Sequence, residues 1–310
     1  MNLYSKSNNG YSPAIIWWHG VLEQMGYDVT YEDYAAYDPK VFLNMIKEKK
    51  PDYVIHPTYT DIHYELAEIR EYTKLIILQS DDRWRYEDFS KKWIPFVYGV
   101  ITFEGNKSKY VEDGLDPDAF YKIRWCFNPN MMCINDKYDK DIELSHTGGL
   151  HGDRSHQISQ INALGKTVHI YQNISYEDAK QVWARTKYNL CFTFNSLCNM
   201  REMKGRIVEI PNYGVLFTED FPDLNDYYSE DEIVVFDGAK DLTEKINYFE
   251  NNPNELLEIF KRGKIALWNR NTAYHEWNKI LPLIDKDFNP IDSIKMLKEY
   301  HGDHYYGEYK

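Results

Sequence analysis

The chain alternates two kinds of hydrophobic pattern. Short apolar runs rich in β-branched residues, such as LIIL at 75–78, are bounded by turn residues, as buried parallel strands are. Between them lie segments whose apolar residues recur at helical spacing. The first half predicts strands at 2–6, 27–34, 51–59, 74–80 and 96–103, and helices at 12–25, 38–50, 61–73 and 106–115. Repeated β-α-β units of this kind predict an open parallel sheet with helices on both faces.

Residues 124–143 interrupt this alternation, because they are polar and contain Pro129, and they are predicted to be a linker between domains. A second series follows it. Its predicted strands are 144–149, 166–173, 188–195, 215–217 and 232–237, and its helical patterns are 153–165, 175–187 and 241–284. The predicted class is therefore α/β, with two Rossmann-like domains facing each other across a cleft. In such sheets, ligands bind beyond the carboxyl ends of the strands.

Composition narrows the class of protein. With 310 residues, 43% of them hydrophobic, the chain can bury two cores. The net charge of −13 would repel a nucleic-acid backbone and gives no strong nucleic-acid signal. We see no secretion signal and no membrane-spanning run, and the four cysteines lack metal-site spacing, so a cytoplasmic protein with free thiols is expected.

A glycine-rich turn follows the first predicted strand of the second series, in SHTGGLHGDR at 145–154. Gly148, Gly149 and Gly152 would let the backbone approach a ligand closely. The next predicted helix offers unpaired N–H groups and Arg154 adds a positive charge, so the segment suits a phosphate or pyrophosphate. A tight βα turn with a solvated arginine explains the same spacing equally well.

The segment MKGRIVEIPNYGVLFTED at 203–220 places Lys204, Arg206 and Glu209 on a predicted helix directly before a buried strand. Arg206 and Glu209 lie three residues apart and share a helix face, so a surface ion pair is one interpretation. The apolar residues around them favour burial instead, where an unpaired carboxylate is costly. Such a carboxylate can accept hydrogen bonds from both hydroxyls of a ribose, and the arginine can meet the diphosphate of the same nucleotide. Pro211 predicts a short or kinked helix.

In the first half, QSDDRWR at 79–85 places Asp81 and Asp82 at the carboxyl end of the apolar strand. These carboxylates could form a metal site for a nucleotide-sugar, bind an acceptor or act as a general base, or simply cap a turn. His56 also follows a predicted strand, although a lone histidine is more often structural. Gly10, in the loop after the first strand, would allow close approach of an acceptor or phosphate.

Over about residues 1–285 the chain resembles GT-B glycosyltransferases of the family-4-like, CgeB/YkvP spore-protein type. The resemblance rests on motifs that follow one another in order: LEQMGYDV, KPDYVI, QSDD, KYVEDGL, ELSHTGGLHGDR, KGRIVEIPNYGVLFTED and DEIVVFDGAKDLTEKINYFENNP. It implies an N-terminal acceptor domain at 1–128, a C-terminal donor domain at 129–285, and a helix and tail at 286–310 that pack back on the N-terminal domain.

The resemblance also implies roles for individual residues. Glu209 would hold the donor ribose, while Arg154 and Arg206 would face the diphosphate. The donor-binding candidates are Gly148, Gly149, Arg154, Lys204, Arg206 and Glu209; the catalytic candidates are Asp81, Asp82 and Arg206; the acceptor-side candidates are Gly10, His56 and Asp81. One position departs from the broader retaining family, which has a sugar-binding glutamate eight residues before the ribose glutamate. Here that position is Arg201, and the nearest acid is Glu202.

The predicted activity is transfer of a hexose or pentose from a nucleoside-diphosphate sugar, with retention and without a metal or other cofactor. Cations and helix N-termini would neutralise the leaving diphosphate. The acceptor could be a glycan, a protein, a lipid or a modified base. Two alternatives stay open: a degenerate protein that binds sugar nucleotides without turnover, and a metal-dependent transferase that uses Asp81 and Asp82.

Overall fold

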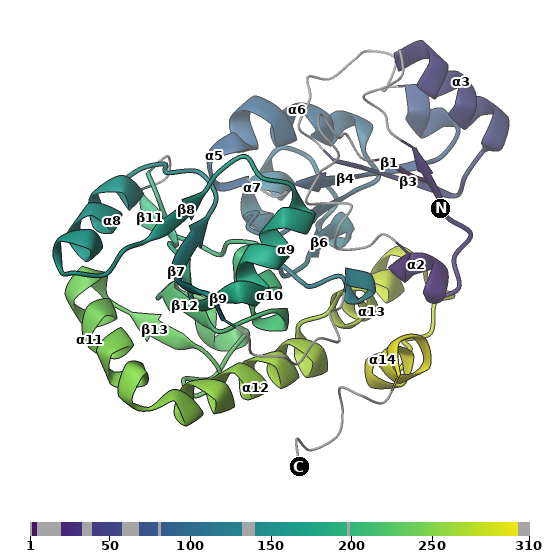
Figure 1. Cartoon of the computed structure of the whole chain (residues 1–310). Helices are drawn as coiled ribbons and strands as arrows, with labels where there is room; N and C mark the ends of the chain where they lie inside the picture. The colour runs from purple at the N-terminus through teal and green to yellow at the C-terminus, as the bar shows by residue number, and fades with distance from the viewer. Residues whose placement is uncertain are drawn as a thin grey trace. The chain divides into compact units, whose positions relative to one another are not determined.

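The computed structural model describes residues 2–4, 20–32, 39–57, 68–79, 82–131, 140–196 and 199–302 (Figure 1). Contacts divide the chain into two compact units, each built from two segments. The first unit comprises Met1–Arg124 and Ala273–Met296, and the second comprises Trp125–Thr272 and Leu297–Lys310. Among the described helices, none is both long enough and apolar enough to cross a membrane.

The first unit contains a six-stranded sheet in which all paired strands are parallel. Its order is β2-β1-β3-β4-β5-β6. The strands are β1 (Asn2–Tyr4), β2 (Thr30–Glu32), β3 (Tyr53–Pro57), β4 (Lys74–Gln79), β5 (Gly99–Thr102) and β6 (Phe120–Lys122). The predicted strands β1 to β5 are confirmed, whereas β6 was missed because its three residues carry no recognisable alternation. In β4, every residue after Lys74 is buried, as expected of a central parallel strand.

Short helices connect these strands. They are α2 (Val21–Gln24), α3 (Pro39–Lys49), η2 (Glu68–Glu71), α5 (Asp82–Arg85), η3 (Tyr86–Ser90), α6 (Lys91–Trp93), η4 (Ile94–Phe96), α7 (Lys107–Glu112) and η5 (Pro117–Ala119). The predictions at 38–50 and 106–115 are confirmed; most of 12–25 and 61–73 lies outside the described residues. The run from α5 to η4 was missed although Tyr86, Ser90, Trp93 and Ile94, all buried, recur at helical spacing.

The second unit contains a five-stranded parallel sheet in the order β13-β12-β9-β7-β8. Its strands are β7 (Ile142–Thr147), β8 (His169–Tyr171), β9 (Thr186–Cys191), β12 (Leu216–Glu219) and β13 (Val234–Phe236). All five were predicted. A separate antiparallel hairpin, β10 (Phe194–Asn195) with β11 (Met200–Arg201), was not, since its strands are only two residues long.

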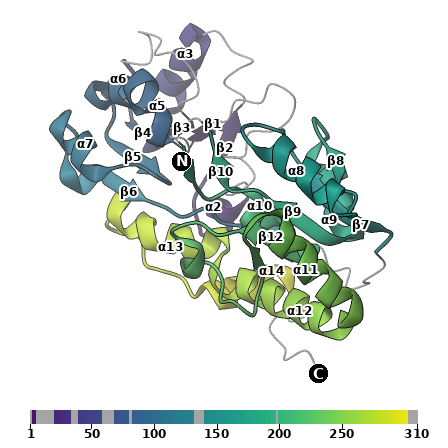
Figure 2. The same cartoon turned by 90° about the vertical axis from the view of Figure 1, so that its left-hand side faces the viewer.

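Helices cover this second sheet. They are η6 (Pro129–Met131), α8 (Arg154–Ala163), α9 (Tyr176–Arg185), α10 (Arg206–Glu209), η7 (Ile210–Asn212), η8 (Leu224–Asp226), α11 (Gly238–Asn251) and α12 (Pro253–Arg270). Figure 2 shows α11 and α12 one after the other along the sheet, and their apolar faces join the strands in one buried core. The helix with Pro211 is short and continues as a 3₁₀ turn, as predicted.

The long helical pattern at 241–284 forms three helices rather than one. The breaks fall at Asn252, before a proline in the first turn of α12, and at 271–272, before α13 (Ala273–Ile284). α13 belongs to the first unit, and the next helix, α14 (Ser293–His301), contains the division between Met296 and Leu297.

One buried carboxylate joins α13 to the rest of the first unit. Glu276, 2% exposed, accepts hydrogen bonds from the backbone N–H of Arg124 at 2.9 Å and from its guanidinium at 2.9 and 3.0 Å. Tyr27 donates to Asp285 at 3.0 Å just beyond the same helix. A buried ion pair is costly to break because the surviving partner stays desolvated.

We expect Glu276→Ala to lower the free energy of unfolding by about 2–4 kcal/mol, because it leaves the Arg124 guanidinium and N–H without their acceptor. Calorimetric melting measures this. The exposed pair of Glu87 with Lys91 supplies the control, since Glu87→Ala should change stability by less than about 0.5 kcal/mol. Equal effects of the two substitutions would contradict the assignment.

Candidate functional site

The candidate site lies at the carboxyl ends of the strands of the second sheet. The strand order reverses between β7 and β9, because β8 lies on one side of β7 and the later strands lie on the other. Such a switch point forms a crevice where open α/β sheets bind ligands. The glycine turn after β7 and the chain after β9 flank this point.

Gly148 makes room in this crevice for an arginine from a distant part of the sequence. Its φ of 122° lies in the region that favours glycine, and its N–H donates to the carbonyl of Tyr171 at 2.8 Å. A Cβ on Gly148 would overlap the guanidinium of Arg206. The glycine therefore permits close packing of the Arg206 side chain, which follows 58 residues later, against the turn.

Arg154 also contacts the glycine turn. Its guanidinium donates to the carbonyl of Gly149 at 2.8 Å, and the residue is only 7% exposed. Burial lowers the pKa of Arg154, and the charge of Arg206 adds to this effect. Arg154 thus holds the backbone of the glycine turn and contributes positive charge at short range.

Arg206 and Glu209 occupy the single turn of α10. Neither side chain forms a hydrogen bond or ion pair with another described residue. Both are partly buried, and burial raises the pKa of Glu209 to about 7 against the opposing charge of Arg206. A cation and a carboxylate on one short helix are thus both available to a ligand.

Lys204, by contrast, has a carboxylate partner. Its ammonium pairs with Glu202, which is 7% exposed and also accepts from the side-chain amide of Asn195 at 2.5 Å. The cations near the glycine turn therefore differ: Lys204 is paired with a carboxylate, whereas Arg206 has no carboxylate partner in the described part of the chain.

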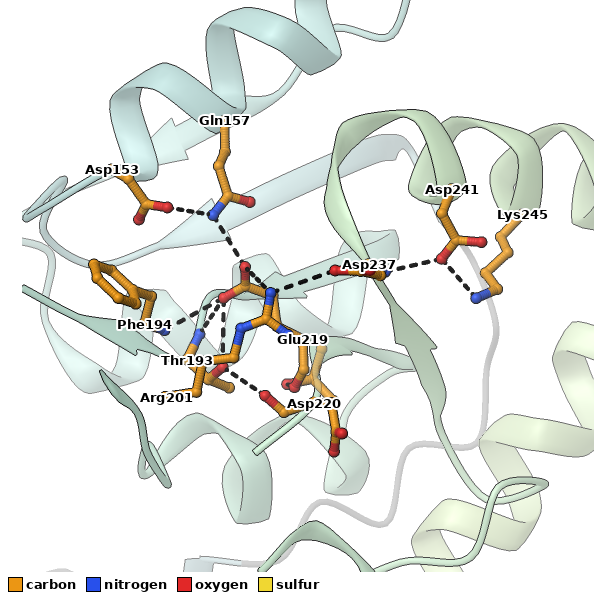
Figure 3. A network of polar contacts seen from close by, with 11 residues as sticks. Asp153, Gln157, Thr193, Phe194, Arg201, Glu219, Asp220, Asp237, Asp241 and Lys245 are labelled. Carbon is orange, nitrogen blue, oxygen red and sulfur yellow. Dashed lines mark hydrogen bonds and ion pairs between the residues drawn. The ribbon is translucent and has the colours of Figure 1, made fainter. Parts of the chain in front are cut away.

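Arg201, at the end of β11, lies between two carboxylates. Its guanidinium is 3.4 Å from Asp237 and 3.8 Å from Glu219. Figure 3 shows Glu219 at the centre of this network. At the position where the resemblance expects a sugar-binding acid, the chain therefore has a cation that is already paired.

Two buried groups, His146 and Cys191, lie near these cations. His146, near the end of β7, is 1% exposed, and burial together with Arg206 and Arg154 lowers its pKa to about 3. It is neutral near pH 7. Burial raises the pKa of the Cys191 thiol to about 11, while the three nearby cations act in the opposite direction.

The first unit holds the other candidates, and the structure describes only some of them. Gly10 and Asp81 lie outside the described residues. Asp82 is 4% exposed, and its carboxylate accepts hydrogen bonds from the hydroxyls of Ser90 (2.5 Å), Thr102 (2.5 Å) and Tyr110 (2.7 Å). These contacts tie α5, η3, β5 and α7 together, which is a structural use of the carboxylate.

His56 is likewise buried, at 2% exposure, near the end of β3. Its ring centre lies 5.3 Å from that of Trp93, and the two rings are tilted by 32°. Among the residues the structure describes, no group of three metal-ligating side chains is present. Asp81 lies outside the described residues, so this finding does not include it.

Sequence reasoning missed Glu219 and His146. In the structure, Glu219 is the last residue of β12 and His146 the last but one of β7. A polar residue at the carboxyl end of a parallel strand is the signal that could have identified them. Their hydrogen-bond partners, however, lie 25 to 62 residues away along the chain.

One family model matches part of the chain. Residues 143–282, which contain the glycine turn, the β10–β11 hairpin and α10, match the model of a family described as glycosyl transferase-like. No curated protein sequence matches the chain.

Solved structures match almost the whole chain. Alr3699/HepE from Anabaena, in complex with UDP and glucose, has a TM-score of 0.56 at 12% identity, over 91% of this chain and 98% of that one. An alpha-glucosyltransferase bound to UDP-glucose and to DNA with an abasic site has a TM-score of 0.67 at 8% identity, over 91% and 98%. MnaA of S. aureus with UDP has a TM-score of 0.51 at 10% identity, over 94% and 97%. The predicted GT-B fold, with two Rossmann-like sheets, is confirmed.

We expect Gly148→Ala to displace the Arg206 side chain and to destabilise the second unit by more than backbone strain alone, which costs about 1–2 kcal/mol. Gly165→Ala is the matched control, because Gly165 also has positive φ (88°) but no atom within 4 Å of a Cβ. Crystal structures and thermal unfolding of both variants test this. An unmoved Arg206 in the Gly148 variant would refute the packing argument.

Proposed function

We propose that this chain is a glycosyltransferase that takes its sugar from a UDP-sugar bound by the second unit. The observation that carries the proposal is α10, where Arg206 and Glu209 lie unpaired among the described residues beside the glycine turn. The family similarity of residues 143–282 supports transfer of a sugar. UDP or UDP-glucose in two neighbours of the same fold supports a uridine diphosphate donor.

In this proposal, each available group has one ligand partner. The ionised carboxylate of Glu209 accepts hydrogen bonds from the two ribose hydroxyls, which replace the water lost on burial. The guanidinium of Arg206 donates to the diphosphate, and the N–H groups of the glycine turn add partial positive charge. Arg154 stabilises the diphosphate mainly through the turn that it holds. Lys204 contributes charge while its ammonium stays with Glu202.

The reaction breaks the bond between the sugar C1 and the diphosphate oxygen and forms a bond from C1 to an acceptor oxygen. The acceptor proton leaves to a base, and the electron pair of the broken bond goes to UDP. Negative charge grows on the diphosphate in the transition state, where a preorganised guanidinium stabilises it. We infer from this cation that no metal is needed, and from the family resemblance that the configuration is retained and that the CgeB/YkvP type applies.

The donor sugar and the acceptor depend on other contacts. Arg201 is engaged by Glu219 and Asp237, and Glu202 by Lys204, so neither resembles the free sugar-binding acid of the retaining family. We propose a hexose, by analogy with the glucose in two of the neighbours.

For the acceptor we favour a hydroxyl on a glycan, lipid or protein, because the net charge of −13 opposes duplex DNA. Asp81 is the candidate base in the first unit, since Asp82 is held by three hydroxyls.

Glu209→Ala should weaken UDP binding at least about 10- to 100-fold, because even one hydrogen bond to a charged acceptor is worth about 1.5–3 kcal/mol. Titration calorimetry with UDP measures the affinity. Glu244→Gln, an exposed glutamate on α11, is the control and should bind as the wild type does. Unchanged affinity in Glu209→Ala would rule out the ribose assignment.

Two further results would favour the alternative functions. Binding of UDP-glucose without turnover on any acceptor would favour a degenerate, non-catalytic protein. Activity lost in EDTA would favour a metal-dependent transferase.

UDP-glucose should bind more weakly as the pH falls through about 7, because only the ionised Glu209 accepts both hydroxyls and its pKa is about 7. Binding near pH 6 should release a proton, which calorimetry detects in buffers of different ionisation enthalpy. The folded-state pKa of Glu209 lies above the ordinary value of a glutamate, so its contribution to stability is full below that ordinary value and is lost as the pH rises through about 7. Glu209→Gln should therefore raise the melting temperature more at pH 8 than at pH 5. A pH-independent affinity in the wild type would contradict this account.

A further inference from the structure

Glu219 is a buried carboxylate that the proposed chemistry does not use. It ends β12, next to β9 in the sheet, and only 1% of the residue is exposed. A bound donor cannot reach it. Desolvating a carboxylate is costly, so its contacts must compensate for this burial.

The first set of contacts fixes the root of the β10–β11 hairpin. Glu219 Oε2 accepts from the backbone N–H of Thr193 at 2.7 Å and of Phe194 at 3.3 Å. The carbonyl of Thr193 in turn accepts from the N–H of Glu202 at 3.1 Å. Glu202 holds Lys204, and α10 begins two residues later. Two hydrogen bonds, one from a backbone N–H to the Glu219 side chain and one between backbone groups, thus link the end of β12 to the segment that leads into α10.

The second contact reaches the other side of the site. Glu219 Oε1 accepts from the side-chain amide of Gln157 at 3.0 Å, and the same amide donates to Asp153 at 2.8 Å. Both residues lie at the start of α8, directly after the glycine turn. Figure 3 shows Gln157 reaching down from α8 to Glu219, while Thr193 and Phe194 approach from the opposite side.

We propose that Glu219 is a positioning residue that sets the spacing between the glycine turn and α10, and so controls donor binding without touching the donor. The inference rests on the proposed function, because the two segments that it joins supply Gly148 and Arg206. Arg201, 3.8 Å from the same carboxylate, balances its charge.

The charge of Glu219 is required, not only its shape. The groups that face its carboxylate are donors: two backbone N–H groups, the Thr193 hydroxyl at 3.4 Å, the Gln157 amide and the Arg201 guanidinium. A glutamine keeps one acceptor oxygen but turns an NH₂ group toward Gln157 and Arg201. That NH₂ group is a poorer partner for the Arg201 guanidinium and for donors of the network, so the contacts that join the two segments should weaken.

The test is UDP affinity by calorimetry in a double-mutant cycle of Glu219→Gln with Arg206→Ala. We expect Glu219→Gln to weaken UDP binding about tenfold in the wild-type background and less than about threefold when Arg206 is already absent. Gln157→Leu, which removes only the α8 contact, should give a smaller loss in the same direction, and it serves as the test if Glu219→Gln does not fold.

Glu276→Gln is the matched control, since Glu276 is also a buried glutamate that accepts from a backbone N–H and an arginine, but in the first unit. It should lower stability and leave UDP affinity unchanged. Wild-type affinity in folded Glu219→Gln and Gln157→Leu would overturn the inference while the proposed function stands. An equal loss in both backgrounds of the cycle would also overturn it, because it would indicate a general structural defect. Absence of UDP binding in the wild type would instead overturn the proposed function itself.

Discussion

The close packing of Arg206 against Gly148 is the constraint on which the candidate site depends. A side chain at residue 148 would occupy the space of the guanidinium, so the glycine and the arginine form one structural unit. This contact brings a helix from the middle of the second unit against the turn after its first strand. It leaves the charge of Arg206 without a carboxylate partner among the described residues, at the switch point of the sheet. A cation beside a glycine turn that precedes a helix is suited to a phosphate ligand.

The cations of the site differ in whether a carboxylate pairs with them. Lys204 and Arg201 are paired with Glu202 and Glu219, so they help to build the scaffold. Among the residues the structure describes, neither Arg206 nor Glu209 has a hydrogen-bond or ion-pair partner, and burial raises the pKa of Glu209 to about 7. A nucleoside diphosphate could interact with both of these groups at once, its phosphates with the cation and its ribose with the carboxylate. One short helix thus presents both a carboxylate and a cation to the same ligand.

Much of this could be predicted from the sequence, because it is local. The apolar run LIIL predicted β4, the spacing of 38–50 predicted α3, and Pro211 predicted the short α10. The glycine turn and Arg206 were each identified, but not their contact, since 58 residues separate them. Glu219 was missed for the same reason: its partners come from α8 and from the chain after β9. The helices at 82–96 were missed although their buried residues recur regularly, because the polar residues between them resemble a loop.

The most direct test of the central claim is a crystal structure of the protein soaked with UDP-glucose. The account predicts the ribose hydroxyls within hydrogen-bonding distance of the Glu209 carboxylate, and the diphosphate between the Gly148 turn and the Arg206 guanidinium. A nucleotide bound elsewhere, with Glu209 still facing no ligand, would contradict it.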